Sequence, residues 1–470
     1  MQELILLYIV TSIVVIFFIV IILGMVFWRK IVRYYFVKIF ESLVAKDYDQ
    51  SLVELIPGVK KVGLQTFFEN SLRAETGDLL YRPLGASKDW PHFDTITFIP
   101  AQTTPFPLDK ERPVDLSVTI GPKAKQPLRV DIPLLISGMA YGVGVSKKVH
   151  LALTKASKNL GTAINSGEGG ILAEALQEVD RFILQYSKTS WAKSDKVLAR
   201  ANMIEIKLGQ GAKAGVGVTL TPSQLTGYAR QVMGLLPDED AVIHEHFFEK
   251  QTLADLKKLV ADLREVTDGV PIGMKLGAGG RLEEDLDRLL QLGVDFISLD
   301  GGQAATHSVN PILADSFGIP TLHALARARK HLDKRGVGRE VSLLISGGLF
   351  TPSHFLKALA LGADAVYLGS SILFATAHRQ TGLALPFSPP TQVMWHEGKY
   401  KHAFDENLGE KYATNFLKSC VKEMEVALRV MGKESLLELS KKDLVAYDYV
   451  TAKMLQIPYS FEPFKTDKRS

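Results

Sequence analysis

A chain of 470 residues that is 46% hydrophobic is long enough for one large barrel with extensions, or for two ordinary domains. Its formal net charge is only +4 and its basic residues are scattered, which argues against a nucleic-acid-binding protein. Cys420 is the only cysteine, so this chain by itself excludes an internal disulfide, a cysteine-ligated zinc site and an all-cysteine iron–sulfur cluster.

Residues 4–28 contain no charged side chain and are rich in Ile, Val, Leu and Phe. Such a run can cross a hydrocarbon layer of roughly 30 Å, so we predict a transmembrane helix. A cleaved signal peptide would instead have a basic start and a shorter apolar core. Arg29, Lys30 and Arg33 follow the run, which predicts a single-pass protein of the cell membrane with its remaining chain in the cytoplasm. A buried helix of a soluble core is the alternative, but it rarely stays apolar on every face for so long.

The next two segments connect this helix to the main domain. Residues 29–80 are amphipathic over much of their length and mixed in charge, which favours a helical linker near the membrane surface. Residues 81–132 contain eight prolines, so extended segments and turns are expected rather than helices. We predict that they form an irregular N-terminal wrap against a barrel.

Eight short apolar runs follow, most of them separated by helical patterns. Eight is the number of strands that a closed parallel barrel needs, so residues 133–380 are predicted to form an α/β fold, a (β/α)₈ TIM barrel. The runs are 133–137, 162–165, 182–185, 203–208, 272–276, 296–300, 342–346 and 365–369. Residues 381–470 begin with a proline-containing loop and end in two predicted helices, one over 411–431 and a shorter one from Ser435.

Residues 341–371 give the clearest pattern within the barrel. An apolar run ends in Ser346-Gly347-Gly348, a helix follows, and a second apolar run ends in Gly369-Ser370. In such barrels the turns after the last two strands form the usual phosphate site, because backbone N–H groups converge there and only small residues admit the phosphate. The alternative is that these are merely tight turns of a parallel sheet.

Other strand ends also carry polar and small residues. The ends of the first, second and fourth strands contain Ser137-Gly138-Met139-Ala140, Asn165-Ser166-Gly167-Glu168 and Lys207-Leu208-Gly209-Gln210. Glycines beside a few charges suit a flat, phosphate-bearing cofactor. Lys275 interrupts the apolar fifth run and is costly to bury unless it faces an anion, although a lysine at a strand end can also reach solvent.

Several common motifs are absent from the sequence. Neither G-x-G-x-x-G after a strand nor G-x-x-x-x-G-K-[ST] occurs, so neither a dinucleotide-binding fold nor a nucleotide triphosphatase is indicated. His244 and His246 would share one face of a strand, but no third ligand is evident and no metal is predicted.

Five segments of the chain, taken together, resemble a known family. They are 203–213 (MIEIKLGQGAK), 165–170 (NSGEGG), 358–365 (ALALGADA), 81–85 (YRPLG) and 120–122 (IGP). Over about residues 80 to 445 the chain is similar to the FMN-binding barrel of glutamate synthase, particularly to short, membrane-anchored bacterial relatives called FMN-binding glutamate synthase family proteins.

The resemblance implies a cofactor, FMN, and a reaction. In this family 2-oxoglutarate and ammonia form 2-iminoglutarate, which reduced FMN converts to glutamate by hydride transfer. By this resemblance Lys275 and Glu168 would be the catalytic residues, and Glu168, Gln210 and Lys213 would bind the dicarboxylate. The residues that would hold FMN are Ser137, Met139, Ala140, Asn165, Lys275, Ser346, Gly347, Gly348, Gly369 and Ser370.

The chain departs from the family in three ways. Where the family carries three cluster-binding cysteines, an ungapped comparison gives His378, Ala384 and Pro389, so the iron–sulfur cluster is not expected and the electron donor is open. After Asp300 the family's Gly-Gly-Glu-Gly-Gly-Thr-Gly is replaced by residues 301–307 (GGQAATH), which leaves the substrate open. No glutaminase domain with an N-terminal cysteine is evident in the sequence, so we do not expect glutamine as the nitrogen source without a partner.

Two alternatives to this interpretation follow from the altered residues. An FMN barrel that oxidises a 2-hydroxy acid would need a histidine base near the flavin, for which His307 is the candidate. A barrel without catalytic activity would serve as a membrane-bound scaffold. The sequence does not choose an electron donor or an oligomeric state, although a homo-oligomer is compatible with it.

Overall fold

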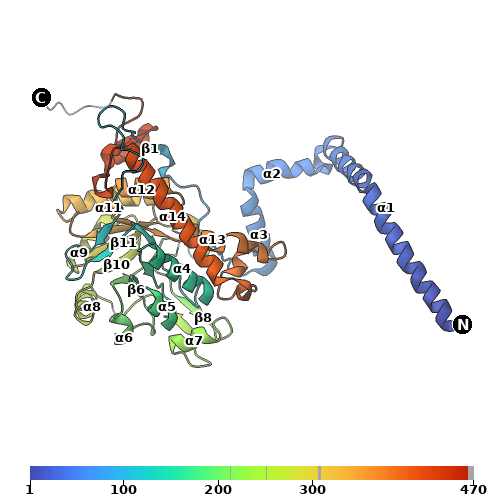
Figure 1. Cartoon of the computed structure of the whole chain (residues 1–470), viewed down its shortest axis with the longest axis horizontal. Coiled ribbons are helices and arrows are strands. Elements are labelled where there is room, and N and C mark those ends of the chain that lie inside the picture. The colour runs from blue at the N-terminus through green and yellow to red at the C-terminus, as the bar shows by residue number, and fades with distance from the viewer. Residues whose placement is uncertain (212, 250, 305–308, 464–470) are drawn as a thin grey trace. The chain divides into compact units, whose positions relative to one another are not determined.

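The computed structural model describes residues 1–211, 213–249, 251–304 and 309–463. The chain divides into two compact units, Met1–Leu80 and Tyr81–Ser470 (Figure 1). Each unit is described below by itself.

The first unit is helical. Its long helix α1 spans Gln2–Val44, so the helix continues beyond the predicted 4–28 segment into the predicted linker. From Glu3 to Val44 it has the length and composition to cross a membrane. The linker continues as two 3₁₀ turns, Tyr48–Gln50 and Leu52–Glu54, and as helices α2 (Leu55–Val62) and α3 (Leu64–Thr76).

The second unit contains a closed barrel of eight parallel strands, and all eight predicted runs are confirmed as its members. The strands follow one another around the barrel in chain order, and the last pairs with the first. They are β4 (Leu134–Ile136), β5 (Ile164–Asn165), β6 (Phe182–Tyr186), β7 (Met203–Lys207), β10 (Ile272–Gly277), β11 (Phe296–Asp300), β12 (Ser342–Ser346) and β13 (Ala365–Leu368). Nearly every residue of these strands is buried, as expected for a sheet covered on both faces.

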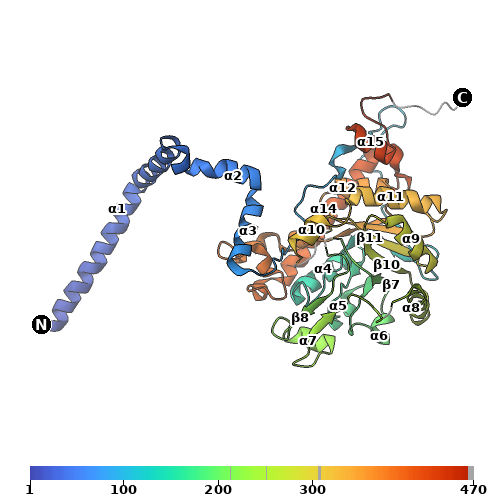
Figure 2. The ribbon, with the colours of Figure 1, turned by 180° about the vertical axis from the view of Figure 1, so that it is seen from behind.

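Helices cover the outside of the barrel, so the fold is the predicted TIM barrel. Figure 2 shows α9 and α11 outside strands β10 and β11. Polar side chains cap several of the helices: Ser146 caps α4, Thr252 caps α8 and Thr351 caps α12. The helices between strands are α4 (Lys147–Asn159), α5 (Ala173–Glu178), α6 (Asp195–Leu198), α8 (Leu253–Val266), α9 (Leu282–Gln291), α10 (Pro311–Ser316), α11 (Thr321–Lys334) and α12 (Pro352–Ala360).

The wrap consists of short extended segments around one 3₁₀ turn, Phe93–Thr95. Strand β1 (Ile96–Phe98) pairs antiparallel with β14 (Leu444–Ala446), so the start and the end of this unit are joined. Strands β2 (Val118–Ile120) and β3 (Leu128–Val130) form a hairpin. The hairpin closes the amino-terminal end of the barrel, where the Gly121 N–H donates to Ser342 Oγ at 3.0 Å.

Three parts of the second unit differ from the sequence predictions. The connection from β7 to β10 carries an unpredicted antiparallel pair, β8 (Val218–Leu220) and β9 (Ala241–Ile243), with α7 (Tyr228–Met233) between them. After β13 come α13 (Ser370–Ala377), a 3₁₀ segment (His378–Leu383) and then α14 (Glu406–Val430), which starts earlier than predicted.

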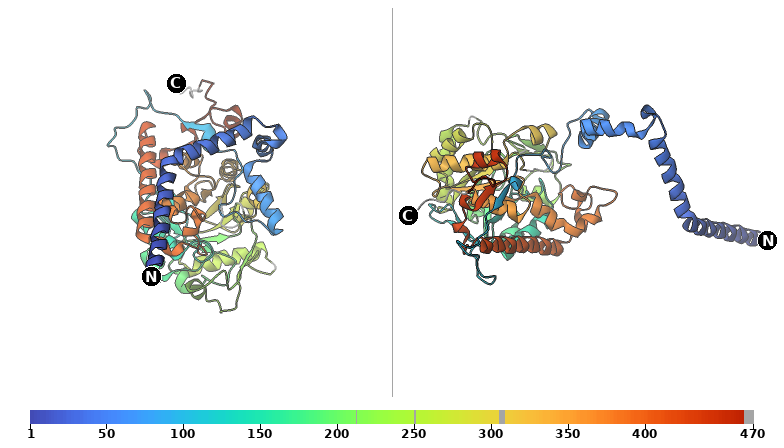
Figure 3. Two further views of the ribbon diagram at one scale, coloured as in Figure 1. Left: turned by 90° about the vertical axis from the view of Figure 1, so that its right-hand side faces the viewer. Right: turned by 90° about the horizontal axis from the view of Figure 1, so that it is seen from above.

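Figure 3 shows α14 as a single long helix along the side of this unit, where it packs on α4 and α13. The prediction of a further helix from Ser435 was wrong, because only a 3₁₀ turn forms there, over Leu436–Glu438. A second 3₁₀ turn (Lys441–Asp443), β14 and α15 (Tyr449–Leu455) follow it.

Candidate active site

A cavity of about 710 Å³ opens at the carboxyl ends of the barrel strands, where TIM-barrel active sites lie. This volume is within the range of roughly 300–1,000 Å³ that small-molecule and cofactor sites occupy. Twelve of the thirteen residues predicted for the site line it. They are Ser137, Met139, Ala140, Glu168, Gln210, Lys213, Lys275, Ser346, Gly347, Gly348, Gly369 and Ser370.

Two turns of small residues form one wall of this cavity. Gly347 and Gly348 follow β12 with φ angles of +114° and +69°, which L side chains rarely adopt. A Cβ atom on Gly347 would lie 2.7 Å from Thr321 Oγ1. Gly369 follows the neighbouring strand β13 and begins α13, and a Cβ atom there would meet nothing closer than Ser137 Cβ at 4.0 Å. Two glycine turns and a helix N-terminus thus face the same space, with room left at Gly369.

Lys275 lies at the floor of the cavity and is 6% exposed, so the alternative that it reaches solvent is excluded. Its Nζ atom is 3.3 Å from Asp300 Oδ1 on the adjacent strand and 5.6 Å from the centre of the Tyr367 ring. Burial opposes the charged form, but Asp300 and Glu205 outweigh it and raise the pKa of Lys275. The cavity therefore contains a fixed, buried ammonium group.

Asp300 is held by more than this ion pair. It accepts hydrogen bonds from Ser346 Oγ and from the Gly211 N–H, the latter at 3.2 Å. Because each carboxylate oxygen is engaged, Asp300 orients Lys275 and also links β11 to the turn after β7.

Glu168 joins two further lysines at the cavity wall. Its Oε1 atom is 2.8 Å from Lys207 Nζ and 3.7 Å from Lys213 Nζ. Burial would raise the pKa of Glu168, but the charges of Lys207 and Lys213 outweigh it and hold that pKa at about 2. Burial is also the main reason why the pKa of Lys213 falls to about 8, an effect that Glu168 partly opposes. One carboxylate between two ammonium groups leaves a net positive charge, which suits a carboxylate ligand.

Asn165 is the one predicted site residue that does not line the cavity. Its Nδ2 atom donates to Glu205 Oε1 at 2.8 Å and to Tyr367 Oη at 3.3 Å, and its Oδ1 atom accepts from the Gly167 N–H. Gln185 Nε2 donates to the same Glu205 oxygen at 2.7 Å. Asn165 thus belongs to a buried network inside the barrel that supports the turn before Glu168.

Comparison with known proteins identifies the family. Residues 90–434 match the family model of the conserved region in glutamate synthase. The chain belongs to the glutamate synthase family. A member from Rhizobium meliloti (strain 1021), the glutamate synthase large subunit-like protein, is 31% identical over 415 residues, covering 84% of this chain and 93% of that protein.

Two archaeal-type members of the family are also similar. The archaeal-type glutamate synthase (NADPH) of Dehalococcoides mccartyi is 31% identical over 321 residues, which cover 64% of each protein. The archaeal glutamate synthase (NADPH) of Methanocaldococcus jannaschii is 28% identical, over 77% of each. Among solved structures, the flavin-binding domain of baker's yeast flavocytochrome b2 has a TM-score of 0.50 at 17% identity, covering 82% of this chain and 88% of that one. This last likeness shows the barrel fold.

The sequence did not predict most of the polar residues that interact with the site residues inside the barrel. Lys207, Gln185, Asp300 and Tyr367 all line the cavity, and Glu205 lies behind its wall, but none was predicted as a site residue. One signal was available in strand β7, where Glu205 and Lys207 stand two residues apart. That spacing puts both side chains on one face of a strand.

Two further predictions concern histidines. His307, the candidate base for 2-hydroxy acid oxidation, lies outside the described residues. His244 and His246 follow β9 instead of lying on it, because the strand ends at Ile243, so the expected shared strand face was wrong. Among the described residues, the one group of three potential metal ligands is His92, Asp94 and His354, which the sequence did not suggest.

Proposed function

We propose that the protein is an FMN-dependent oxidoreductase of glutamate synthase type, which reduces 2-iminoglutarate, formed from 2-oxoglutarate and ammonia, to glutamate. One observation carries this proposal: two glycine turns on adjacent strands and a buried lysine open into a single cavity of about 710 Å³. Family membership supports the reaction type.

The residues that line the cavity are suited to binding FMN. Gly347, Gly348 and the start of α13 would hold its phosphate, since backbone N–H groups at a helix N-terminus and at glycine turns bind anions. Ser370, in the first turn of α13, lines the same cavity and offers a hydroxyl donor. Ser137, Met139 and Ala140 would line the ring system, and Lys275 would stabilise negative charge on it.

Bound FMN would supply the hydride in this reaction. The chain's own residues would bind and orient the substrate. Lys213 Nζ, with a pKa of about 8, is protonated at neutral pH and attracts a substrate carboxylate, while Gln210 offers an amide donor. Glu168 remains ionised at neutral pH because its pKa is about 2, so its proposed role is to hold Lys207 and Lys213 in place and not to donate a proton.

The membrane anchor and the domain boundaries belong to the same proposal. Residues 4–28 would span the cell membrane once, 29–80 would link the anchor to the barrel, and 81–132 would wrap the barrel. Residues 133–380 would form the cytoplasmic FMN-binding barrel, followed by C-terminal elements over 381–470. The anchor is supported by α1, which is apolar and long enough to cross a membrane.

The test uses the purified full chain in detergent. We expect a yellow protein whose bound flavin, once reduced anaerobically, is reoxidised by 2-oxoglutarate plus ammonia but by neither alone. NADPH is the first reductant to try, because two relatives carry it in their names, with NADH and a quinol as parallel arms. Reduction of the oxidised flavin by a 2-hydroxy acid would contradict the substrate assignment, and a colourless protein that binds no FMN would favour the scaffold.

A further inference from the structure

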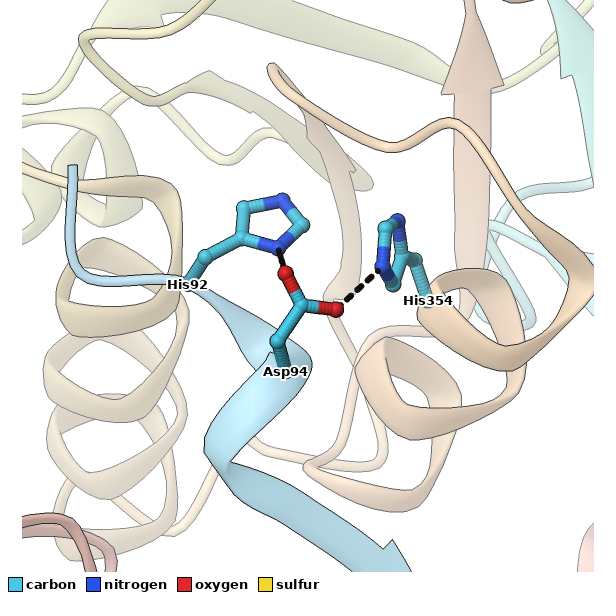
Figure 4. A group of neighbouring side chains, drawn as sticks. All are labelled: His92, Asp94 and His354. Atoms are coloured by element: carbon cyan, nitrogen blue, oxygen red, sulfur yellow. Dashed lines mark hydrogen bonds and ion pairs between the residues drawn. The ribbon is translucent and has the colours of Figure 1, made fainter. Parts of the chain in front are cut away.

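Behind the turn that follows β12 lies a cluster of His92, Asp94 and His354 (Figure 4). His92 and Asp94 belong to the wrap, and His354 belongs to α12. His92 Nδ1 is 3.2 Å from Asp94 Oδ2, and His354 Nε2 is 2.9 Å from Asp94 Oδ1. None of the three residues lines the cavity, yet the cluster touches the turn from outside.

Both ends of the cluster return to this one turn. The Phe350 N–H donates to His354 Nδ1 at 3.3 Å, and His92 Nε2 contacts the Gly348 carbonyl oxygen. Gly348 and Phe350 both line the cavity. A path of hydrogen bonds therefore runs from Phe350 through His354, Asp94 and His92 back to Gly348, and it closes around the outer side of the turn.

The partners of each ring assign its protons. His354 Nδ1 accepts from a backbone N–H, so its proton is on Nε2 and is donated to Asp94. His92 has acceptors on both sides, a backbone carbonyl at Nε2 and the Asp94 carboxylate at Nδ1, so its ring N–H can only be directed to one of these two groups. The hydrogen bond from His354 lowers the pKa of Asp94, although burial opposes this effect.

Hydrogen bonds from other elements fix the wrap at this place. Lys357 Nζ, on α12, donates to the Phe93 carbonyl at 3.1 Å, and Tyr447 Oη donates to the Asp94 carbonyl. The cluster is thus anchored to α12 and to the segment after β14, so it can hold a turn whose two glycines have little intrinsic stiffness.

The arrangement disfavours a metal site, although the three ligand atoms lie within 4.8 Å of one another. A histidine that ligates a metal donates its other ring N–H to an acceptor. If His354 Nε2 bound a metal, Nδ1 would carry that proton and would face the Phe350 N–H, which is itself a donor.

We infer that His92, Asp94 and His354 form a positioning clamp that holds residues 347–350 in the conformation that binds the phosphate of FMN. This inference rests on the proposed function. Because the clamp already holds the turn in place, it would reduce the entropic cost of ordering residues 347–350 when the phosphate binds. A hydrogen bond from His92 Nε2 to the Gly348 carbonyl would also polarise the peptide that joins Gly348 to Leu349, making its N–H a stronger donor.

The test compares two flavins that differ only in the phosphate. FMN and riboflavin are titrated against the full chain in detergent, and their dissociation constants are measured by quenching of flavin fluorescence. For His92→Ala and Asp94→Asn we expect the FMN dissociation constant to rise about tenfold, and the riboflavin constant less than about twofold. His92→Gln, which keeps one donor for Gly348, should recover part of the FMN affinity.

The matched control is His331→Ala, because His331 Nε2 forms a similar pair with Asp287 at 2.8 Å on the outer helices α11 and α9. This variant should leave both constants unchanged. The clamp is contradicted if the wild-type chain binds FMN and the His92 and Asp94 variants bind it equally well, or lose both flavins in parallel. A wild-type chain that binds no FMN contradicts the proposed function itself. Bound zinc whose removal by EDTA weakens FMN binding would replace the clamp with a metal site.

Discussion

At the residue scale, the most informative side chain is Lys275. Its presence in an apolar strand predicted an anionic partner, and the structure supplies Asp300 at 3.3 Å. The partner itself could not be predicted, because Asp300 lies 25 residues away and only the register of β10 on β11 brings the two together. Asn165 is a predicted site residue with a different outcome. Its place at a strand end indicated a contact with a ligand, whereas its side chain forms hydrogen bonds within the barrel.

The first prediction tests this buried pair. Lys275→Met leaves Asp300 buried without its cation, and breaking a buried pair in this way costs about 3–5 kcal/mol of unfolding free energy. Lys275→Met combined with Asp300→Asn should recover at least half of that loss, because the uncompensated charge is then gone. Urea-induced unfolding followed by tryptophan fluorescence measures both, and exposed Lys334→Met serves as the control. A single variant as stable as the wild type would contradict the pairing.

The second prediction concerns the charge of Lys213. Its pKa of about 8 means that the ammonium form predominates below pH 8 and is lost above it. The attraction to a substrate carboxylate should be lost in the same range, so kcat/KM should fall as pH rises through about 8. In Lys213→Arg, kcat/KM should stay constant to higher pH, since a guanidinium remains protonated.

A neutral variant measures how much that charge contributes. A charge-assisted hydrogen bond is worth about 1.5–3 kcal/mol, so Lys213→Gln should lower kcat/KM by roughly 10- to 100-fold while the dissociation constant for FMN is maintained. Lys196→Gln, on an exposed position of α6, should change neither quantity. An identical pH profile for the wild type and Lys213→Arg would exclude Lys213 from substrate binding.

At the scale of elements, the two glycine turns differ in what surrounds them. Gly347 has a φ of +114°, and a Cβ atom would approach Thr321 Oγ1 to 2.7 Å and the Ala304 nitrogen to 2.8 Å. A Cβ atom on Gly369 would have only one neighbour within 4 Å, Ser137 Cβ at 4.0 Å. One turn is therefore constrained by the fold, and the other by whatever occupies the cavity.

The third prediction uses this difference. Gly347→Ala should destabilise the protein by about 1–3 kcal/mol, because the backbone must leave a conformation that alanine does not tolerate. Gly369→Ala should leave unfolding unchanged but raise the FMN dissociation constant at least about tenfold, because the methyl group enters the phosphate space. Urea unfolding and flavin titration separate the two effects, with Gly279→Ala as a control in open space. Undiminished FMN binding by Gly369→Ala would move the phosphate elsewhere.

The barrel strands that the sequence predicted share one physical property. All eight barrel strands are buried on both faces, so each appears as a short, nearly continuous apolar run. Strand β8 has no buried residue, whereas β9 is buried at two of its three positions but pairs only with β8, outside the barrel. The pairing of β1 with β14 joins residues almost 350 positions apart, and no local signal encodes such a contact.

At the scale of the whole molecule, the division at Leu80 separates a helical unit from a barrel unit that closes on itself through β1 and β14. Arg82 belongs to the second unit, where it forms an ion pair with Asp315. A chain starting at Tyr81 therefore retains the wrap, the barrel and their mutual contacts. If α1 serves only to anchor the protein, removal of residues 1–80 should change its location and not its ligand binding.

The fourth prediction follows from that separation. The full chain should remain with membranes after washes in high salt and in alkaline carbonate and should be released by detergent, because roughly 20 apolar residues in a helix suffice for stable insertion. The 81–470 chain should appear in the soluble fraction with an FMN dissociation constant within about twofold of the full chain.

As the control, a chain starting at residue 133 lacks β1 and the hairpin of β2 and β3, and it should fail to fold. Extraction of the full chain by carbonate would show that α1 lies on the membrane or binds a partner instead of spanning the bilayer. Loss of FMN binding in the 81–470 chain would show that the first unit contributes to the site.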